Sequence, residues 1–276
     1  MENKKFSYSV LMSVYKNDKG DFLDKAIESM NNQTIPFNDF VLVCDGPLSS
    51  NLNDVIAKWK LILRDKLQVI RLKRNYGLGY ALNAGLKKCS CEIVARMDSD
   101  DISRVSRCQL LLKKMKEENL DLVGGAIEEF DVIPGDLKSI RKTPLQKEEI
   151  LKWAKSRNPF NHMTVMFRKQ AVFNAGGYLP FRWMEDYWLW VRMLMKGVNC
   201  ANISDVVVDV RVGNGMYYRR SNIKYFIYQC KFYCKLQRIG FVNVFEAIKS
   251  ITQRLAITLI PKKAVKFVYN RLLRAK

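Results

Sequence analysis

The first 130 residues alternate short apolar runs with segments of helical periodicity, and this alternation limits the fold more than any other feature of the chain. Strands are predicted over residues 9–14, 40–44, 67–72, 93–97 and 121–126. Helices are predicted between them, among them residues 53–64, 79–88 and 107–118. Strands that alternate with helices favour a mostly parallel sheet with helices on both faces. The sequence therefore predicts an α/β fold with a doubly wound sheet.

After residue 130 the alternation is looser. We predict helices over residues 146–156 and 185–195, and strands over residues 161–168 and 206–212. A chain of 276 residues, 48% of them hydrophobic, is long enough to bury one large core and still carry an appendage. We divide it into a domain of residues 1–218 and a helical extension of residues 219–276.

Most of the excess positive charge lies in that extension. The formal net charge is +20, and residues 219–276 hold 14 lysines and arginines but one acidic residue, Glu246. Such a segment favours a polyanionic partner, either nucleic acid or an anionic membrane surface. Between Lys262 and Arg274 apolar side chains fall on one side of a helix and basic ones on the other. This is typical of a helix lying in a membrane interface, although a surface helix packed on the domain has the same pattern.

The cysteines and the start of the chain are less informative. The chain has seven cysteines and one histidine, His162, and they are not spaced as the ligands of a Cys/His zinc site. The N-terminus has no apolar signal segment, and no apolar run is long enough to cross a membrane. We expect reduced thiols in a cytosolic protein.

Three carboxylates, those of Asp98, Asp100 and Asp101, follow the apolar run Ile93–Met97. Carboxylates this close repel one another, so a cation is expected to compensate them. A divalent ion with oxygen ligands fits, and such ions often bridge to phosphates. Ligands of parallel sheets bind at the carboxyl ends of the strands, where residues 13–15 and Asp45 are also predicted. These positions predict a metal-assisted site for a phosphorylated ligand.

An ordered set of motifs over about residues 7–212 resembles the family 2 glycosyltransferases, which have the GT-A fold, a Rossmann-like and mostly parallel sheet flanked by helices. The motifs are Ser9-Val-Leu-Met-Ser-Val-Tyr15, Val43-Cys-Asp45-Gly, Arg74-Asn-Tyr-Gly77, Ala81-Leu-Asn-Ala-Gly85, Met97-Asp-Ser-Asp-Asp101, His162-Met-Thr-Val-Met-Phe-Arg168, Gly176-Gly-Tyr178 and Glu185-Asp-Tyr-Trp-Leu-Trp-Val-Arg192. The nearest subgroup is that of bacterial surface-polysaccharide enzymes, of the amylovoran or O-antigen assembly type.

The resemblance implies that the first half of the chain binds a nucleotide-sugar donor. It implies that Ser13 and Tyr15 line the base and ribose, and that Asp45 accepts a hydrogen bond from a uracil ring nitrogen. The same resemblance places a loop beside the nucleotide, formed by Arg74, Asn75 and Gly77. The family commonly has a second aspartate before the glycine, where this chain has Cys44-Asp45-Gly46, so the base contact rests on Asp45 alone.

Asp98 and Asp100 match the family's Asp-x-Asp motif, which holds Mn²⁺ or Mg²⁺ against the diphosphate. Asp100 is the expected direct ligand, Asp98 a second ligand that also contacts the donor, and Ser99 a donor-binding residue. Asp101 is expected to shape the turn.

Glu185 and Asp186 open a predicted helix, where carboxylates are favoured by the helix dipole whatever their function. The resemblance implies that Asp186 is the general base for an acceptor hydroxyl, with Glu185 orienting it or contacting the acceptor. His162 matches a stretch near the donor or acceptor pocket and is a secondary candidate, because a lone histidine is often structural.

The resemblance therefore implies an inverting, metal-dependent transfer from a UDP-hexose or UDP-N-acetylhexosamine to a lipid-diphosphate-linked glycan. The protein would act in O-antigen, capsule or exopolysaccharide synthesis, in the cytoplasm and peripheral on the inner face of the cell membrane. Two other function classes remain open. A sugar-1-phosphate nucleotidyltransferase would need a glycine-rich loop after the first strand, which residues 14–18 lack. A nucleic-acid-binding module would explain the charge, but no recognised motif is present and no nucleic acid is expected.

Overall fold

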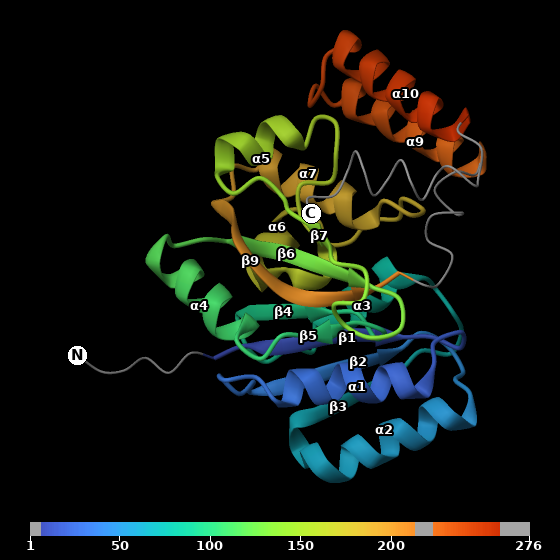
Figure 1. The fold of residues 1–276 in the computed structure, drawn as a ribbon, viewed down its shortest axis with the longest axis vertical. Helices are drawn as coiled ribbons and strands as arrows, with labels where there is room; N and C mark the ends of the chain where they lie inside the picture. The colour runs from blue at the N-terminus through green and yellow to red at the C-terminus, as the bar shows by residue number, and fades with distance from the viewer. Residues whose placement is uncertain (1–6, 213–222, 260–276) are drawn as a thin grey trace.

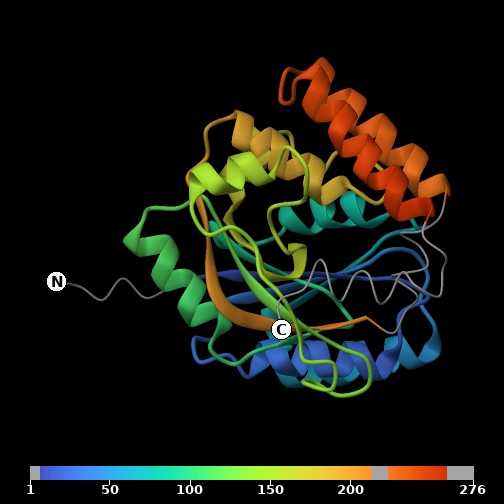
Figure 2. The same ribbon diagram turned by 45° about the horizontal axis from the view of Figure 1, so that its top comes forward.

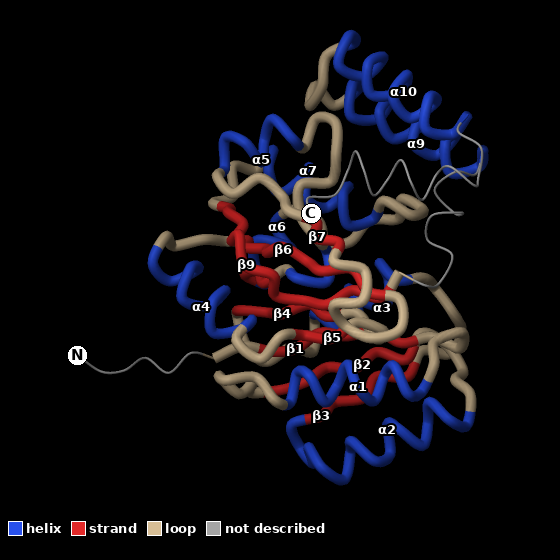
Figure 3. Tube along the Cα trace, in the orientation of Figure 1, coloured by secondary structure: helices blue, strands red, loops and turns tan. Residues whose placement is uncertain are grey.

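The computed structural model describes residues 7–212 and 223–259. In these ranges one nine-stranded sheet lies between two layers of helices, with a helical hairpin packed outside one layer (Figure 1). The strands form a continuous layer between the helices (Figure 3). The predicted α/β fold class is confirmed.

The first half of the sheet is parallel and follows the predicted strands closely. It contains β1 (Ser9–Val14), β2 (Asp39–Cys44), β3 (Leu67–Arg71) and β4 (Ile93–Met97). In the ladders β1 pairs with β2 and with β4, and β2 pairs with β3, all in parallel. Because all four strands run the same way, their carboxyl ends meet at one edge of the sheet.

The second half of the sheet is mixed. It contains β5 (Ile102–Ser103), β6 (Leu122–Phe130), β7 (Ser139–Arg141), β8 (Met166–Arg168) and β9 (Cys200–Arg211). β8 inserts antiparallel between β4 and β6, and β6 pairs in parallel with β9. β5 pairs antiparallel with β9, and β7 pairs antiparallel with β6. The strand order of the whole sheet is β3-β2-β1-β4-β8-β6-β9-β5, with β7 beside β6. The predicted strand 121–126 is therefore β6, longer than expected and not beside β4.

Only the end of the predicted strand 161–168 is extended, because residues His162–Thr164 form a 3₁₀ turn, η2. Side chains bind the backbone there. The Asn161 amide donates to the carbonyl of Gly125 at 2.9 Å, and the Thr164 hydroxyl accepts from the N–H of Gly125 at 3.0 Å. Such bonds compete with strand pairing, and they turn the chain before β8 begins.

Two helix layers cover the sheet (Figure 2). One contains α1 (Gly20–Asn31), α2 (Ser50–Leu63) and α4 (Arg107–Glu117), and its apolar side chains form one core with β1 and β2. The other contains α3 (Leu78–Leu86), α5 (Lys147–Trp153), α6 (Lys169–Asn174) and α7 (Glu185–Met195). The bounds predicted for α7 are confirmed.

The hairpin of α9 (Ile223–Arg238) and α10 (Val244–Leu259) packs against α7. Phe232 and Leu236 of α9 are fully buried in a third apolar cluster, which includes Tyr187 and Trp188 of α7. No helix in residues 7–212 and 223–259 is long and apolar enough to span a bilayer. The predicted boundary at residue 218 and the amphipathic segment between Lys262 and Arg274 lie outside the described residues.

Candidate active site

A cavity of about 680 Å³ opens at the carboxyl edge of β1, β2 and β4. We call it the Asp98 cavity. It brings together most of the residues predicted to bind the donor and the metal: Ser13, Tyr15, Asp45, Asn75, Gly77, Asp98, Ser99 and Asp100. Arg74 is not among the lining residues; it is exposed, and its guanidinium lies 4.9 Å from the ring centroid of Tyr76.

Asp45 holds the loop that precedes α3. Its two carboxylate oxygens accept hydrogen bonds from the N–H groups of Tyr76 at 2.8 Å and Gly77 at 2.9 Å. The amide of Asn75 donates to the Asp45 carbonyl at 3.3 Å. Gly46 has a φ of +93°, and a Cβ there would lie 2.7 Å from the backbone nitrogen of Asn75. This buried aspartate therefore builds the wall of the cavity, whatever contact it makes with a base.

The three clustered aspartates have different surroundings. Asp98 forms an ion pair with the buried guanidinium of Arg96, and Asp100 lines the cavity. Asp101 is buried, and its carboxylate accepts from the N–H of Arg211 at 2.9 Å. Asp101 thus ties the turn after β4 to the end of β9, as expected of a residue that shapes the turn.

Asp18 also lines the Asp98 cavity, and sequence reasoning missed it. Its carboxylate accepts from the N–H of Tyr15 at 3.0 Å and from the Ser99 hydroxyl at 2.9 Å. Burial, and to a smaller extent Asp98, raises the pKa of Asp18 to about 6. Asp18 is hard to recognise as a site residue from the sequence, because aspartate is common in the turns that follow strands.

These carboxylates fit a divalent cation. Asp18, Asp98 and Asp100 line the same cavity, and burial, then Asp98 and Asp18, raises the pKa of Asp100 to about 6. No group of three or more His, Cys, Asp or Glu side chains within the described ranges is arranged to hold a metal ion by itself. Mg²⁺ is commonly held by one or two carboxylates together with substrate phosphates and water. Asp98 and Asp100 suit such a shared site, completed by a diphosphate.

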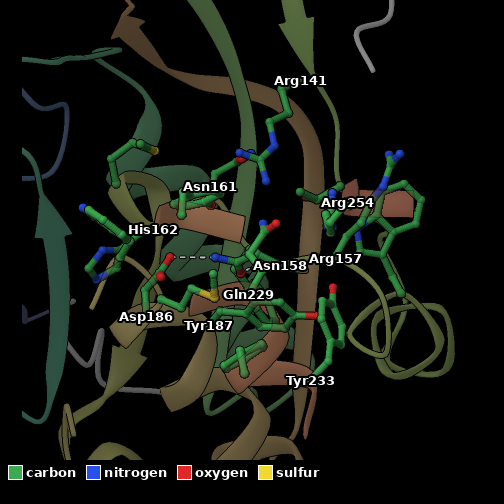
Figure 4. Close-up of a pocket in the computed structure, with 18 of the residues that line it drawn as sticks. Arg141, Arg157, Asn158, Asn161, His162, Asp186, Tyr187, Gln229, Tyr233 and Arg254 are labelled. Atoms are coloured by element: carbon green, nitrogen blue, oxygen red, sulfur yellow. Dashed lines mark hydrogen bonds between the residues drawn. The ribbon is translucent and has the colours of Figure 1, made fainter. Parts of the chain in front are cut away.

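A second cavity, of about 280 Å³, surrounds Asp186 at the start of α7 (Figure 4). We call it the Asp186 cavity. Its walls come from the end of β7, the segment after α5, and the helices α9 and α10. The Asp186 carboxylate accepts from the Asn158 amide at 2.6 Å, and burial raises its pKa. A basic carboxylate at a cavity wall can take a proton from a bound hydroxyl.

Glu185 faces a different neighbour. A Cβ placed on Gly79 of α3 would lie 3.7 Å from the Cβ of Glu185, so this residue lies against α3. Its Oε2 is buried and has no hydrogen-bond partner among the described residues. Burial, and secondarily Asp186, raises the pKa of Glu185 to about 7. The first turn of α7 thus directs two carboxylates to different surroundings.

His162 lines the edge of the Asp186 cavity and is buried. One ring nitrogen is 2.9 Å from the Tyr178 hydroxyl, and Trp190 packs edge-on at 5.9 Å between centroids. Burial, then Arg96, keeps the pKa of His162 well below its usual value, so the ring is neutral. These contacts give His162 a structural role.

Arg96 of β4, which the sequence did not single out, pairs with Asp98 and lies within electrostatic reach of Asp100 and of the α7 carboxylates Glu185 and Asp186. It is buried, and two of its guanidinium nitrogens, Nε and Nη1, have no hydrogen-bond partner in the described part of the chain. Its charge lowers the pKa of Asp100 and of both Glu185 and Asp186, against the larger effect of burial. One buried cation therefore stabilises the charged forms of carboxylates in both cavities and at the start of α7.

Comparison with known proteins identifies the family of this chain. Residues 9–177 match the family described as glycosyl transferase family 2. The chain belongs to glycosyl transferase family 2. A curated relative from Escherichia coli, named UDP-Gal:alpha-D-GlcNAc-diphosphoundecaprenol beta-1,3-galactosyltransferase, is 36% identical over 268 residues, which are 97% of this chain and 96% of the relative. The amylovoran biosynthesis glycosyltransferase AmsE of Erwinia amylovora is 36% identical over 96% of this chain and 98% of its own.

Solved structures show the same fold for this family 2 member. S. aureus TarS 1–349 aligns with a TM-score of 0.62 and 17% identity, over 96% of this chain and 74% of TarS. The mannosyltransferase PcManGT from Pyrobaculum calidifontis, solved with GDP-Man and Mn²⁺, aligns with a TM-score of 0.65 and 15% identity, over 95% of this chain and 78% of its own. The family 2 chain is a glycosyltransferase, and the predicted enzyme class is confirmed.

Proposed function

We propose that this glycosyltransferase moves a hexose or N-acetylhexosamine from a UDP-sugar to a sugar on a lipid diphosphate, in bacterial surface-polysaccharide synthesis. The observation that carries the proposal is the 36% identity, along nearly the whole of both chains, to a relative named for UDP-Gal and a GlcNAc-diphosphoundecaprenol acceptor. The two cavities support it, because donor and acceptor need separate sites that meet at one carbon atom.

In this proposal the donor nucleotide occupies the Asp98 cavity and the acceptor occupies the Asp186 cavity. Asp186 takes the proton from the acceptor hydroxyl as its oxygen attacks the anomeric carbon. The bond to the UDP oxygen breaks on the opposite face, so the configuration inverts. Asp98 and Asp100 would hold the divalent ion, which supplies charge stabilisation for the leaving diphosphate when bound. Asn158 orients the base through its hydrogen bond.

The function is tested by incubating the protein with single UDP-sugars, beginning with UDP-galactose, and a synthetic GlcNAc-diphosphate lipid. We expect the acceptor mass to increase by one hexose or N-acetylhexosamine, and EDTA to abolish the increase. If no UDP-sugar gives a product although the protein binds UDP, the proposed acceptor class is wrong.

The transfer rate is expected to depend on pH through the α7 carboxylates. Asp186 must be deprotonated to act as a base, and burial raises its pKa. Protonation of Glu185, with a pKa of about 7, removes a second negative charge from the site. The ratio kcat/KM should therefore fall as pH drops from about 7.5 toward 5. The Glu185→Gln variant should move this acid limb to lower pH, because Asp186 loses a repelling neighbour. A rate that is constant between pH 5 and 8 would contradict the assignment.

We propose that the hairpin binds the anionic cytoplasmic face of the membrane. On α10, Phe245 is 83% exposed and Ile248 is 57% exposed, and Lys249 follows them. Apolar side chains beside cations suit an interface with anionic lipids.

The variant Phe245→Gln/Ile248→Gln tests this membrane proposal. It should reduce co-sedimentation with anionic liposomes about tenfold, because two exposed apolar side chains are lost. Val132→Gln, which removes an exposed apolar side chain from the loop after β6, serves as the matched control. Equal liposome binding by the double variant and the control would mean that the hairpin does not contact the membrane.

A further inference from the structure

The Asp186 cavity is lined by positive charges that are not needed for proton transfer to Asp186. Four cationic side chains line it, those of Arg141, Lys142, Arg157 and Arg254, whereas Asp186 is the one carboxylate among the described lining residues. A cavity with this charge favours an anionic ligand, and arginine pairs well with the oxygens of phosphates.

Arg254 of α10 is the best-defined of these cations. Its Nη2 donates to the carbonyl of Ser156 at 2.7 Å, and the Tyr233 hydroxyl donates to the same carbonyl at 2.6 Å. Its Nε is buried and has no hydrogen-bond partner among the described residues. A buried N–H without a partner is costly. Arg254 is therefore fixed in place at the cavity wall, and one of its donors is not used by any described residue.

Two further arginines approach the cavity from other elements. The guanidinium of Arg157, after α5, lies 5.4 Å from the ring centroid of Trp153. The charge of Arg141, at the end of β7, lowers the pKa of Asp186, so it lies within electrostatic reach of the base. Figure 4 shows Asp186 and His162 toward one end of the cavity and Arg157 and Arg254 toward the other.

We propose that this cavity binds a glycosyl diphosphate, with the sugar toward Asp186 and the diphosphate at Arg157 and Arg254. The inference rests on the proposed function and specifies how its acceptor is recognised. A sugar ring separates the reacting hydroxyl from the diphosphate on the anomeric carbon. A carboxylate at one end of a small cavity and arginines at the other match that ligand. The cations would select acceptors that carry the diphosphate.

The test compares two acceptors, a synthetic GlcNAc-diphosphate lipid and an uncharged GlcNAc glycoside with the same alkyl chain. Arg254→Gln and Arg157→Gln should each raise the KM for the diphosphate acceptor roughly 10- to 100-fold, the loss expected for a charge-assisted hydrogen bond. The KM for the UDP-sugar should stay within about twofold of wild type, and the KM for the uncharged glycoside should rise far less than that for the diphosphate acceptor. Arg238→Gln, an exposed cation at the end of α9 that does not line the cavity, is the matched control.

Equilibrium binding of the diphosphate lipid, measured in EDTA without donor, gives a readout that needs no turnover. The arginine variants should weaken this binding by the same factor and stay folded, although Arg254→Gln should unfold at a somewhat lower temperature because its hydrogen bond to the Ser156 carbonyl is lost. The inference is overturned if the variants leave diphosphate binding unchanged, or if they weaken both acceptors equally. If wild type transfers no sugar but binds the diphosphate lipid through the arginines, the proposed function fails and this inference stands.

Discussion

Replacing Asp186 with asparagine is expected to lower kcat by roughly 10²- to 10⁴-fold, the usual contribution of a positioned general base. The amide has almost the same shape and can still accept the hydrogen bond from Asn158, so the fold of the α7 terminus should persist. The lost function is the ability to take a proton. Because Asp186 does not line the Asp98 cavity, the affinity for UDP-sugar should change by less than about twofold. Initial transfer rates and calorimetric titration with UDP-sugar measure the two quantities.

Glu185→Gln is the matched control for this prediction. Glu185 lies against α3 and does not line the Asp186 cavity, so its replacement should cost far less than that of Asp186. If Glu185→Gln abolishes transfer while Asp186→Asn keeps more than a tenth of the rate, the base is Glu185.

Replacing Asp100 with asparagine should lower the transfer rate roughly 100- to 1,000-fold, as expected when one group that stabilises a leaving anion is lost. The carboxylate lies in the Asp98 cavity, where burial, then the neighbouring Asp98 and Asp18, raises its pKa to about 6. An amide is a weaker ligand than a carboxylate for Mn²⁺ or Mg²⁺, so the metal concentration needed for half-maximal rate should increase. Titration of the rate with Mn²⁺ measures this shift.

Asp101→Asn separates the metal effect from a structural one. The Asp101 carboxylate accepts a hydrogen bond from the backbone of Arg211 and lies away from the lining of the cavity. An amide oxygen can still accept that hydrogen bond, so this variant should stay folded and keep the wild-type metal requirement. Wild-type activity that persists undiminished in EDTA would rule out a metal at Asp98 and Asp100.

Several features could be predicted because the signals are local. Apolar runs and helical spacing set β1, β4 and α7 almost to the residue, since burial of one face requires a fixed period. Residues at or just beyond the carboxyl ends of parallel strands must lie at one sheet edge, which placed Ser13, Asp45 and Asp100 in one cavity. The family motifs suggest a chemical role for each of those positions, and these roles are predictions.

Local sequence patterns are enough to locate the strands of the parallel half and the carboxylates at their ends, because periodicity and strand polarity act over a few residues. Packing of the whole chain places β8 between β4 and β6, and it brings Arg96 within electrostatic reach of both Asp100 and Asp186. It also brought Arg141, Arg157 and Arg254 around Asp186. Those contacts join residues up to about a hundred positions apart, and no local pattern encodes them, because they depend on how whole helices and strands pack.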